Sequence, residues 1–170
     1  VKGMKTYRHG IYRRFFKRPL DFTLALLAIV VLSPIFLIIA ALVKIKLGSP
    51  VIFKQQRPGL NEKIFTMYKF RTMRVDAPHD TPTHLLKNAN NHITGVGRLL
   101  RKTSLDELPQ LFNVIKGDMS LVGPRPCLPY EFENYDEWQK RRVSVIPGCT
   151  GVWQVWGRSI VTFQESIVLD

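Results

Sequence analysis

Residues 20–43 read LDFTLALLAIVVLSPIFLIIAALV, and their only ionisable residue is Asp21, near the start. As one continuous helix, at about 1.5 Å per residue, this stretch would be about 36 Å long. That length would cross a hydrocarbon core of roughly 30 Å. The stretch therefore predicts a membrane helix, which we place at residues 20–47.

Two features of this stretch argue against a simple crossing. Ser33-Pro34 lies in its middle, where proline removes a helical hydrogen bond and kinks or breaks the helix. Basic residues flank both ends, Arg13 to Arg18 before it and Lys44 with Lys46 after it, so the positive-inside tendency favours both ends on one side. A re-entrant hairpin broken at Ser33-Pro34 satisfies both features if groups such as the Ser33 hydroxyl bond to the freed backbone. An ordinary kinked transmembrane helix is the alternative.

The segment before the helix, residues 1–19, is strongly basic. The chain carries a formal net charge of +12, and residues 1–18 contain no acid but seven of its cations: Lys2, Lys5, Arg8, Arg13, Arg14, Lys17 and Arg18. Such cations are attracted to anionic lipid headgroups, each by about 1 kcal/mol near the surface. A nucleic-acid-binding arm would also be basic. Because a long apolar run follows, we expect lipid contact and no nucleic acid partner, and a protein that needs detergent to stay in solution.

Residues 48–170 have the composition of one water-exposed domain, with a mixed, helix-rich α/β fold. Residues 51–54 and 64–70 are rich in strand formers around a turn signal at Arg57-Pro58-Gly59, which predicts a short β-hairpin. Residues 76–92 are polar and contain three histidines without helical metal-site spacing, so we predict a surface loop. Cys127 and Cys149 show no CxxC spacing, and we expect free thiols.

Residues 104–117, SLDELPQLFNVIKG, predict an amphipathic helix. Ser104 can cap its start, Glu107 stands at the capping-box position, and the final glycine can close it. Pro109 fits best near a first turn, so a later start, nearer Leu108, is the alternative. In both cases Asp106 and Glu107 lie at a helix N-terminus.

Two interpretations of this Asp-Glu pair remain open from spacing alone. Acidic residues at a helix start often do no more than complement the helix dipole. However, three basic residues lie among residues 98–102, and two prolines stiffen the backbone around Arg125. Carboxylates near arginines suit phosphoryl transfer, because one acid can attack phosphorus, another can hold a divalent ion, and arginine can neutralise phosphate oxygens.

The stretch KTSLDELPQLFNVIKGDMSLVGPRP, residues 102–126, resembles the signature of the bacterial sugar transferase family, the monotopic phosphoglycosyl transferases. The resemblance covers nearly the whole chain, through KRPLDF (17–22), SP (33–34), QQRPGLNEKIFTMYKFRTM (55–73), GRLLRKTS (97–104) and PGCTGVWQVWGR (147–158). It implies a re-entrant membrane helix broken at Ser33-Pro34, with the catalytic domain on the cytoplasmic face of the bacterial inner membrane. Members usually continue past the equivalent of Asp170, so we expect the full protein to be longer.

The resemblance also implies an activity, the transfer of a sugar 1-phosphate from a UDP-sugar to polyprenyl (undecaprenyl) phosphate with release of UMP. This is the first membrane step of exopolysaccharide, lipopolysaccharide O-antigen or other glycoconjugate synthesis. Asp106 matches the family's nucleophile, which forms a covalent aspartyl-phosphosugar intermediate, and Glu107 matches the carboxylate that holds Mg²⁺. Arg125 matches a phosphate-contacting arginine, and Arg101 a basic residue close to the Asp-Glu pair. A catalytically inactive, membrane-attached scaffold of the same fold is the alternative.

Four further positions match the family with less defined roles. Lys69 and Arg71 in YKFRTM, and Gln154 and Arg158 in GVWQVWGR, are expected to line the nucleotide or phosphate site. Surface cations and a structural glutamine would give the same pattern. A homodimer is compatible with the sequence, which leaves the oligomeric state open.

Overall fold

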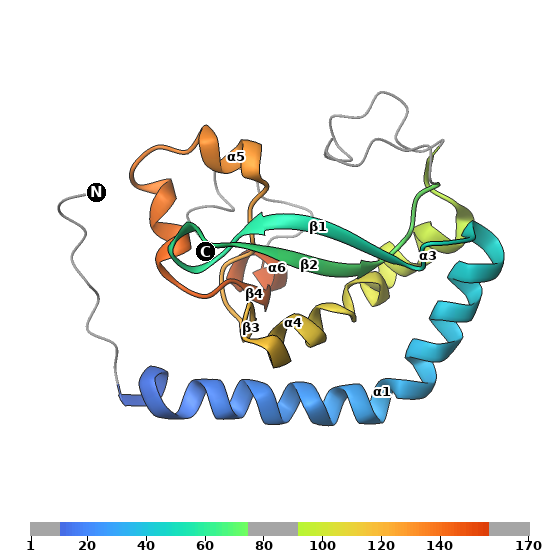
Figure 1. The fold of residues 1–170 in the computed structure, drawn as a ribbon, viewed down its shortest axis with the longest axis horizontal. Coiled ribbons are helices and arrows are strands. Elements are labelled where there is room, and N and C mark those ends of the chain that lie inside the picture. The colour runs from blue at the N-terminus through green and yellow to red at the C-terminus, as the bar shows by residue number, and fades with distance from the viewer. Residues whose placement is uncertain (1–10, 75–91, 157–170) are drawn as a thin grey trace.

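The computed structural model describes residues 11–74 and 92–156 (Figure 1). The predicted mixed, helix-rich α/β fold is confirmed, with one long N-terminal helix, a small β-hairpin and several shorter helices. The elements run in the order η1 (Tyr12–Phe16), α1 (Lys17–Leu47), β1 (Ile52–Pro58), η2 (Leu60–Glu62), β2 (Ile64–Phe70), α3 (Gly95–Thr103), η3 (Leu105–Glu107), α4 (Gln110–Lys116), β3 (Ser120–Val122), α5 (Pro129–Glu133), η4 (Gln139–Ser144), β4 (Gly148–Thr150) and α6 (Val152–Trp156).

Helix α1 contains 31 residues, and most of its surface is apolar and exposed. Within the described part of the chain it is the one helix long and apolar enough to cross a membrane, and only 11% of its most apolar window is buried. A core helix of this composition would be mostly covered by protein. The exposed apolar surface indicates a membrane-associated protein.

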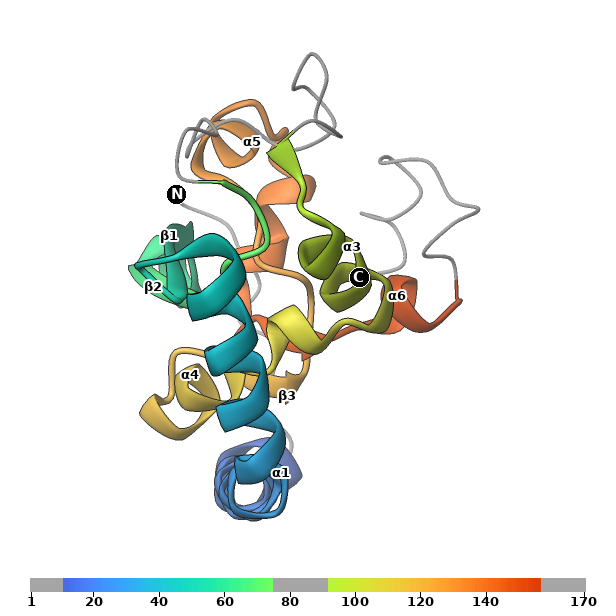
Figure 2. The same cartoon turned by 90° about the vertical axis from the view of Figure 1, so that its right-hand side faces the viewer.

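The hydrogen-bonded helix continues through Ser33-Pro34, so the predicted break is wrong in that detail: α1 bends but does not stop. Figures 1 and 2 both show it changing direction between its two halves. Pro34 has no N–H to donate to the carbonyl of Val30, one turn earlier. The Ser33 hydroxyl donates to that carbonyl instead, at 2.8 Å. The expected partner for the freed backbone is therefore confirmed, and a bend replaces the break.

Both halves of α1 contribute to the hydrophobic core. In the first half, Ala25 packs in a buried cluster with side chains of β2, α4 and the loop after α4: Phe65, Met67, Val114 and Met119. In the second half, Ile39 and Val43 form a separate cluster with Phe70 and Leu100. Helix α4 lies between α1 and the hairpin (Figures 1 and 2).

Polar side chains at the start of α1 fix it to the rest of the chain. Asp21 is buried and accepts hydrogen bonds from the Ser120 hydroxyl at 2.7 Å and the Leu121 N–H at 3.3 Å. Arg18 donates to the carbonyls of Val114 and Ile115, at the C-terminal end of α4, where a cation also complements the helix dipole. Lys17 likewise donates to a backbone carbonyl in β3. Arg18 and Lys17, two of the seven cations that were expected to face lipid, therefore bind protein.

Strands β1 and β2 form the predicted antiparallel hairpin, with Ile52 opposite Phe70 and Pro58 opposite Ile64. Arg57 and Pro58 belong to β1, so the predicted turn is displaced. The chain reverses at residues 59–63, where the Gly59 N–H bonds to the carbonyl of Lys63 at 2.9 Å and Asn61 adopts a positive φ of 52°. A proline at the end of a strand removes few hydrogen bonds from the sheet, so the pairing between strands can override the local turn signal.

The predicted 104–117 helix is shorter than expected at its start. Ser104 has φ 59° and ends α3, so it does not cap the next helix with its side chain. Asp106 and Glu107 form the 3₁₀ turn η3, and α4 begins at Gln110, after Pro109. This later start follows from Pro109, which has no N–H for an earlier helical bond. Gly117 closes α4 with φ 95°, as predicted.

Strands β3 and β4 form a short parallel pair, which brings residues 124–126, the Pro-Arg-Pro segment, beside residues 148–150. Two glycines make this approach possible. A Cβ added to Gly148 would lie 2.1 Å from the backbone nitrogen of Gly123, so no side chain fits there.

Candidate active site

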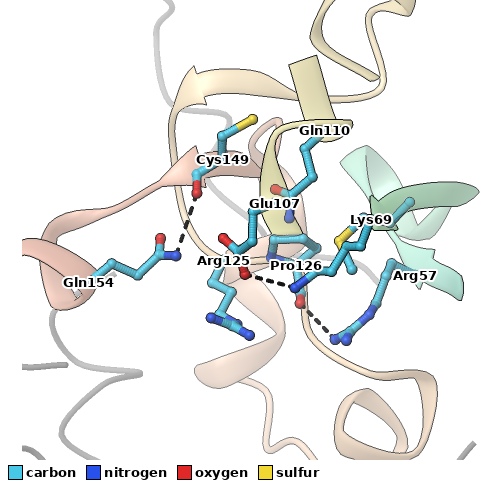
Figure 3. A pocket seen from close by; sticks show the side chains of 10 residues that line it. Arg57, Lys69, Glu107, Gln110, Arg125, Pro126, Cys149 and Gln154 are labelled. Carbon is cyan, nitrogen blue, oxygen red and sulfur yellow. Dashed lines mark hydrogen bonds and ion pairs between the residues drawn. The ribbon is translucent and has the colours of Figure 1, made fainter. Parts of the chain in front are cut away.

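The described elements meet around an open pocket with about 220 Å³ of empty space (Figure 3). Strands β1 and β2, the η3 turn, the Pro-Arg-Pro segment, β4 and α6 all contribute to its wall. The lining side chains carry three cations, one carboxylate and two amides. They are Arg57, Met67, Lys69, Glu107, Gln110, Arg125, Pro126, Gly148, Cys149 and Gln154.

Lys69 and Glu107 form an ion pair inside this pocket. The Nζ atom of Lys69 lies 2.7 Å from Oε1 of Glu107, and both side chains are mostly buried. Burial lowers the pKa of Lys69, and the facing Glu107 carboxylate opposes that shift. The hairpin thus presents an ammonium group directly to the Asp-Glu pair.

Asp106 is 8% exposed and does not line the open part of the pocket. Burial raises the pKa of its carboxyl, while the charges of Lys69 and Arg101 pull the pKa back down. Neighbouring Glu107 adds to the upward shift, because two close carboxylates disfavour each other's charge. Asp106 is therefore buried next to Glu107, in a poorly solvated environment with two cations nearby.

Arg101 reaches this environment from the end of α3. Its Nε donates to the Thr72 hydroxyl at 2.8 Å, which fixes the base of the guanidinium. Burial lowers the pKa of Arg101, and Asp106 counteracts this. The structure thus brings Arg101 close to Asp106, although Arg101 is not part of the pocket lining.

Arg57 is a site residue that the sequence analysis did not identify. It is buried in β1, and its Nη atoms donate to the carbonyl of Pro126 at 3.0 Å and to Oε1 of Gln55 at 2.7 Å. Burial, followed by the charge of Arg125, lowers the pKa of Arg57 to about 10. Its position within the family-like stretch 55–73 was the available signal, which the turn assignment at Arg57-Pro58-Gly59 obscured.

Of the three remaining predicted site residues, one lines the pocket, one lies elsewhere, and one is outside the described residues. Gln154 lines the pocket: its amide nitrogen donates to the carbonyl of Cys149 at 3.4 Å, and its buried Oε1 has no hydrogen-bond partner among the described residues. Arg71 lies elsewhere, donating to the carbonyls of Leu47 and Ser49 at the end of α1. Arg158 lies outside the described residues. Substrate-binding roles for Arg71 and Arg158 stay predictions.

Both cysteines are free, as predicted. Burial raises the pKa of Cys127 to about 11 and that of Cys149, which lines the pocket, to about 12. Across residues 11–74 and 92–156, no group of three or more His, Cys, Asp and Glu side chains could enclose a metal ion. A metal held by protein ligands alone does not fit this part of the chain.

A carboxylate pair close to buried cations, on a chain with one exposed apolar helix, is compatible with a membrane-associated transferase. The chain belongs to the bacterial sugar transferase family, whose sequence profile it matches over residues 12–170. It is 49% identical over 154 residues to the uncharacterized sugar transferase EpsL of Bacillus subtilis, covering 91% of this chain and 75% of that protein. It is also 44% identical over 175 residues to the galactosyl transferase CpsE of Streptococcus agalactiae, covering 96% of this chain and 38% of CpsE.

A third relative carries a more specific name. The undecaprenyl-phosphate galactose phosphotransferase of Salmonella typhimurium is 40% identical over 172 residues, covering 92% of this chain and 36% of that protein. The chain therefore spans little more than a third of the length of two of these relatives and three quarters of EpsL.

Proposed function

We propose that this protein transfers a sugar 1-phosphate from a UDP-sugar to polyprenyl phosphate and releases UMP. The observation that carries the proposal is the buried Asp106 behind a pocket with three cationic side chains. A diphosphate brings two or more negative charges, and Lys69 and Arg125 provide compensating charge where water is partly excluded. The name of the Salmonella relative, an undecaprenyl-phosphate galactose phosphotransferase, supports the same acceptor.

In the first half-reaction, a carboxylate oxygen of Asp106 attacks the β-phosphorus of the UDP-sugar. The new bond joins Asp106 to this phosphorus, the bond to the bridging oxygen breaks, and its electron pair leaves with UMP. In the second half-reaction, a phosphate oxygen of the polyprenyl phosphate attacks the same phosphorus and the Asp106 carboxylate leaves. Arg125 and Lys69 stabilise the charge on the phosphoryl oxygens during both steps.

Attack by Asp106 requires its ionised form. Burial works against ionisation, while Lys69 and Arg101 favour it. The same burial keeps water away from the carboxylate, which protects an acyl-phosphate intermediate from hydrolysis. The cations around Asp106 thus keep its carboxylate ionised before the reaction, in addition to their role during transfer.

The donor set around Glu107 fits Mg²⁺ only if the substrate shares in binding it. Mg²⁺ prefers octahedral oxygen ligands and is often held by one or two carboxylates together with substrate phosphates. Glu107 lines the pocket and can provide one such carboxylate, although its Oε1 also contacts Lys69. When bound, Mg²⁺ would neutralise charge on the diphosphate oxygens. Glu107 is the residue that we expect to hold it.

The membrane geometry suits a lipid acceptor. The exposed apolar surface of α1 would lie in the bilayer, and its ends would return to the cytoplasmic face of the inner membrane in a re-entrant arrangement. The bend at Ser33-Pro34 supports this proposal, because a bent helix can enter and leave through one leaflet. The polyprenyl phosphate headgroup would then reach the pocket from the same face.

The decisive experiment distinguishes transfer through the enzyme from direct transfer between bound substrates. A panel of UDP-sugars is incubated with the detergent-purified protein without polyprenyl phosphate. We expect the cognate sugar to release UMP in an amount no greater than that of the enzyme, and the intact protein to gain the mass of one phosphosugar.

Asp106→Asn should abolish the adduct and the UMP release, because it keeps the size of the side chain but loses the nucleophile. Asp136→Asn, which alters an exposed aspartate between α5 and η4, is the matched control and should react normally. An adduct on the Asp106→Asn variant would refute the role of Asp106. If no sugar yields UMP with or without the acceptor, the inactive scaffold becomes the better description.

A further inference from the structure

The backbone of the Pro-Arg-Pro segment is held from three directions. The carbonyl of Pro124 accepts from the Gly148 N–H at 2.9 Å, in β4. The carbonyl of Arg125 accepts from Nη2 of Arg142 at 3.2 Å, in η4, and that of Pro126 from Nη1 of Arg57 at 3.0 Å, in β1. The prolines at 124 and 126 also have fixed φ angles and no N–H. Three consecutive carbonyls are therefore anchored on three separate elements.

The two arginine donors are themselves held by second bonds. Arg57 also donates to Oε1 of Gln55 at 2.7 Å, and Nη1 of Arg142 donates to the Tyr135 hydroxyl at 3.2 Å. A planar guanidinium that bonds at two points has little freedom left, unlike a lysine ammonium. Arg57 and Arg142 therefore act as fixed links between the Pro-Arg-Pro segment and the walls of the fold.

We propose that Arg57 and Arg142 are positioning residues, which hold the backbone of Arg125 so that its guanidinium stays directed at the diphosphate in the pocket. The inference rests on the proposed function, in which Arg125 contacts phosphate oxygens. Arg57 lines the pocket as well, so direct phosphate binding by Arg57 is the competing explanation. Its Nη1 donates to the carbonyl of Pro126, which joins Arg57 directly to the backbone beside Arg125 and favours action through Arg125 (Figure 3).

The test is a double-mutant cycle on single-turnover UMP release. Arg57→Lys and Arg142→Lys keep the charge but cannot reproduce the two-point geometry, so each should slow release roughly 10- to 100-fold, the usual cost of a small misplacement. In an Arg125→Ala background the same substitutions should change the rate by less than about twofold, because coupled residues are not additive. Arg141→Lys, which alters the exposed neighbour of Arg142, should leave the rate unchanged.

Two kinetic outcomes would overturn the proposal. Full activity of both lysine variants would show that neither arginine matters for positioning. An equal loss with and without Arg125 would show that the arginines act directly on substrate or only on global stability.

Hydrogen exchange of the peptide 123–128 provides a readout that needs no activity. Both lysine variants should speed exchange of the Gly123 and Leu128 amides, which donate to Thr150 and Glu131 at the two ends of the segment, while leaving α4 protected. Unchanged exchange there would refute the anchoring even if the variants unfold more easily. Failure of the unaltered protein to release UMP from any UDP-sugar would instead refute the proposed function, and exchange would still decide whether the arginines hold the segment.

Discussion

Asp106 and Glu107 are adjacent in sequence but have different surroundings. In the 3₁₀ turn, Glu107 lines the pocket and pairs with Lys69, whereas Asp106 is buried and does not line the pocket. Each carboxylate can consequently have its own task, since one is accessible to a cation and the other is shielded from water. The difference arises from the short turn that Pro109 imposes, because a regular helix starting at Leu105 would have placed both acids on its exposed first turn.

The metal dependence can be tested at Glu107. We expect excess EDTA to abolish UMP release, and Glu107→Gln to raise the Mg²⁺ concentration needed for half-maximal release at least about tenfold, a typical effect of losing a charged ligand. Glu62→Gln changes an exposed carboxylate in η2 and is the control. Full activity in EDTA would show that no divalent ion takes part.

The thiol of Cys127 predicts a pH effect on stability. Its pKa is raised by burial to about 11 in the folded protein, whereas an unfolded cysteine ionises near about 8.5. Between these values the unfolded chain releases a proton that the folded chain keeps, so stability falls as pH rises through this window. The slope due to this thiol is at most about 1.4 kcal/mol per pH unit. Below about pH 8 the contribution is constant.

Urea unfolding at a series of pH values from about 7 to about 10.5, which includes most of this window, should detect the slope. Cys127→Ala should flatten the alkaline decline, whatever its effect at neutral pH. An unchanged slope would show that the Cys127 thiol does not remain protonated in the folded protein.

The candidate site could be predicted from sequence only where a side chain lies in a recognisable local pattern. Asp106, Glu107 and Arg125 lie in one uninterrupted stretch; Glu107 and Arg125 line the pocket, and Asp106 is buried next to Glu107. Arg57 escaped prediction because its significance depends on Pro126, 69 residues away. Arg71 donates to the carbonyls of Leu47 and Ser49, contacts that local sequence could not indicate, and its substrate role stays a prediction.

Among the secondary-structure elements, the hairpin also shows that local sequence does not predict features that depend on long-range contacts. Strand composition placed β2 at its observed bounds, Ile64–Phe70. The extent of β1 depends on its pairing with β2, and this pairing drew Arg57 and Pro58 into the strand. Local turn propensity is a weak preference that cross-strand contacts can override.

The re-entrant arrangement proposed for the bent helix α1 predicts the topology of the protein. A labelled cysteine placed before Leu20 and another placed after Ser49 should both react with an impermeant reagent from the cytoplasmic side only. Replacing Ser33-Pro34 by two leucines should restore the missing hydrogen bond and favour a straight, spanning helix. The second cysteine should then become accessible from the opposite side.

Leu37→Val, at an exposed position of the same helix, keeps Ser33-Pro34 and is the control for this labelling. Opposite-side labelling of the unaltered protein would show that α1 already spans the bilayer.

For the whole molecule, α1 is part of the folded body as well as an apolar surface. Ala25, Ile39 and Val43 complete two buried clusters, and Asp21 satisfies polar groups of β3. Deleting residues 1–47 should therefore prevent cooperative folding of the remainder, even in detergent. The measurement is the thermal unfolding transition followed by near-ultraviolet circular dichroism.

A matched variant separates loss of the core from loss of the membrane surface. Substituting exposed apolar residues of α1 with polar ones, at Leu27, Val31 and Ile38, leaves the buried residues in place. This variant should unfold cooperatively while binding less detergent. A cooperative transition in the deletion protein would show that the domain folds without its helix.

The hydrogen bonds of Asp21 also bear on how the protein is made. Asp21 and Ser120 are 99 residues apart, and Arg18 and Ile115 are 97 apart, so α1 leaves the ribosome long before its partners exist. At translation rates of about 5–20 residues per second, this delay is on the order of 5 to 20 s. During that interval the nascent helix has no protein surface to cover it, and the lipid bilayer is the environment that can receive it. We therefore expect the membrane to hold the first-made segment until α4 and β3 are synthesised and can dock on it.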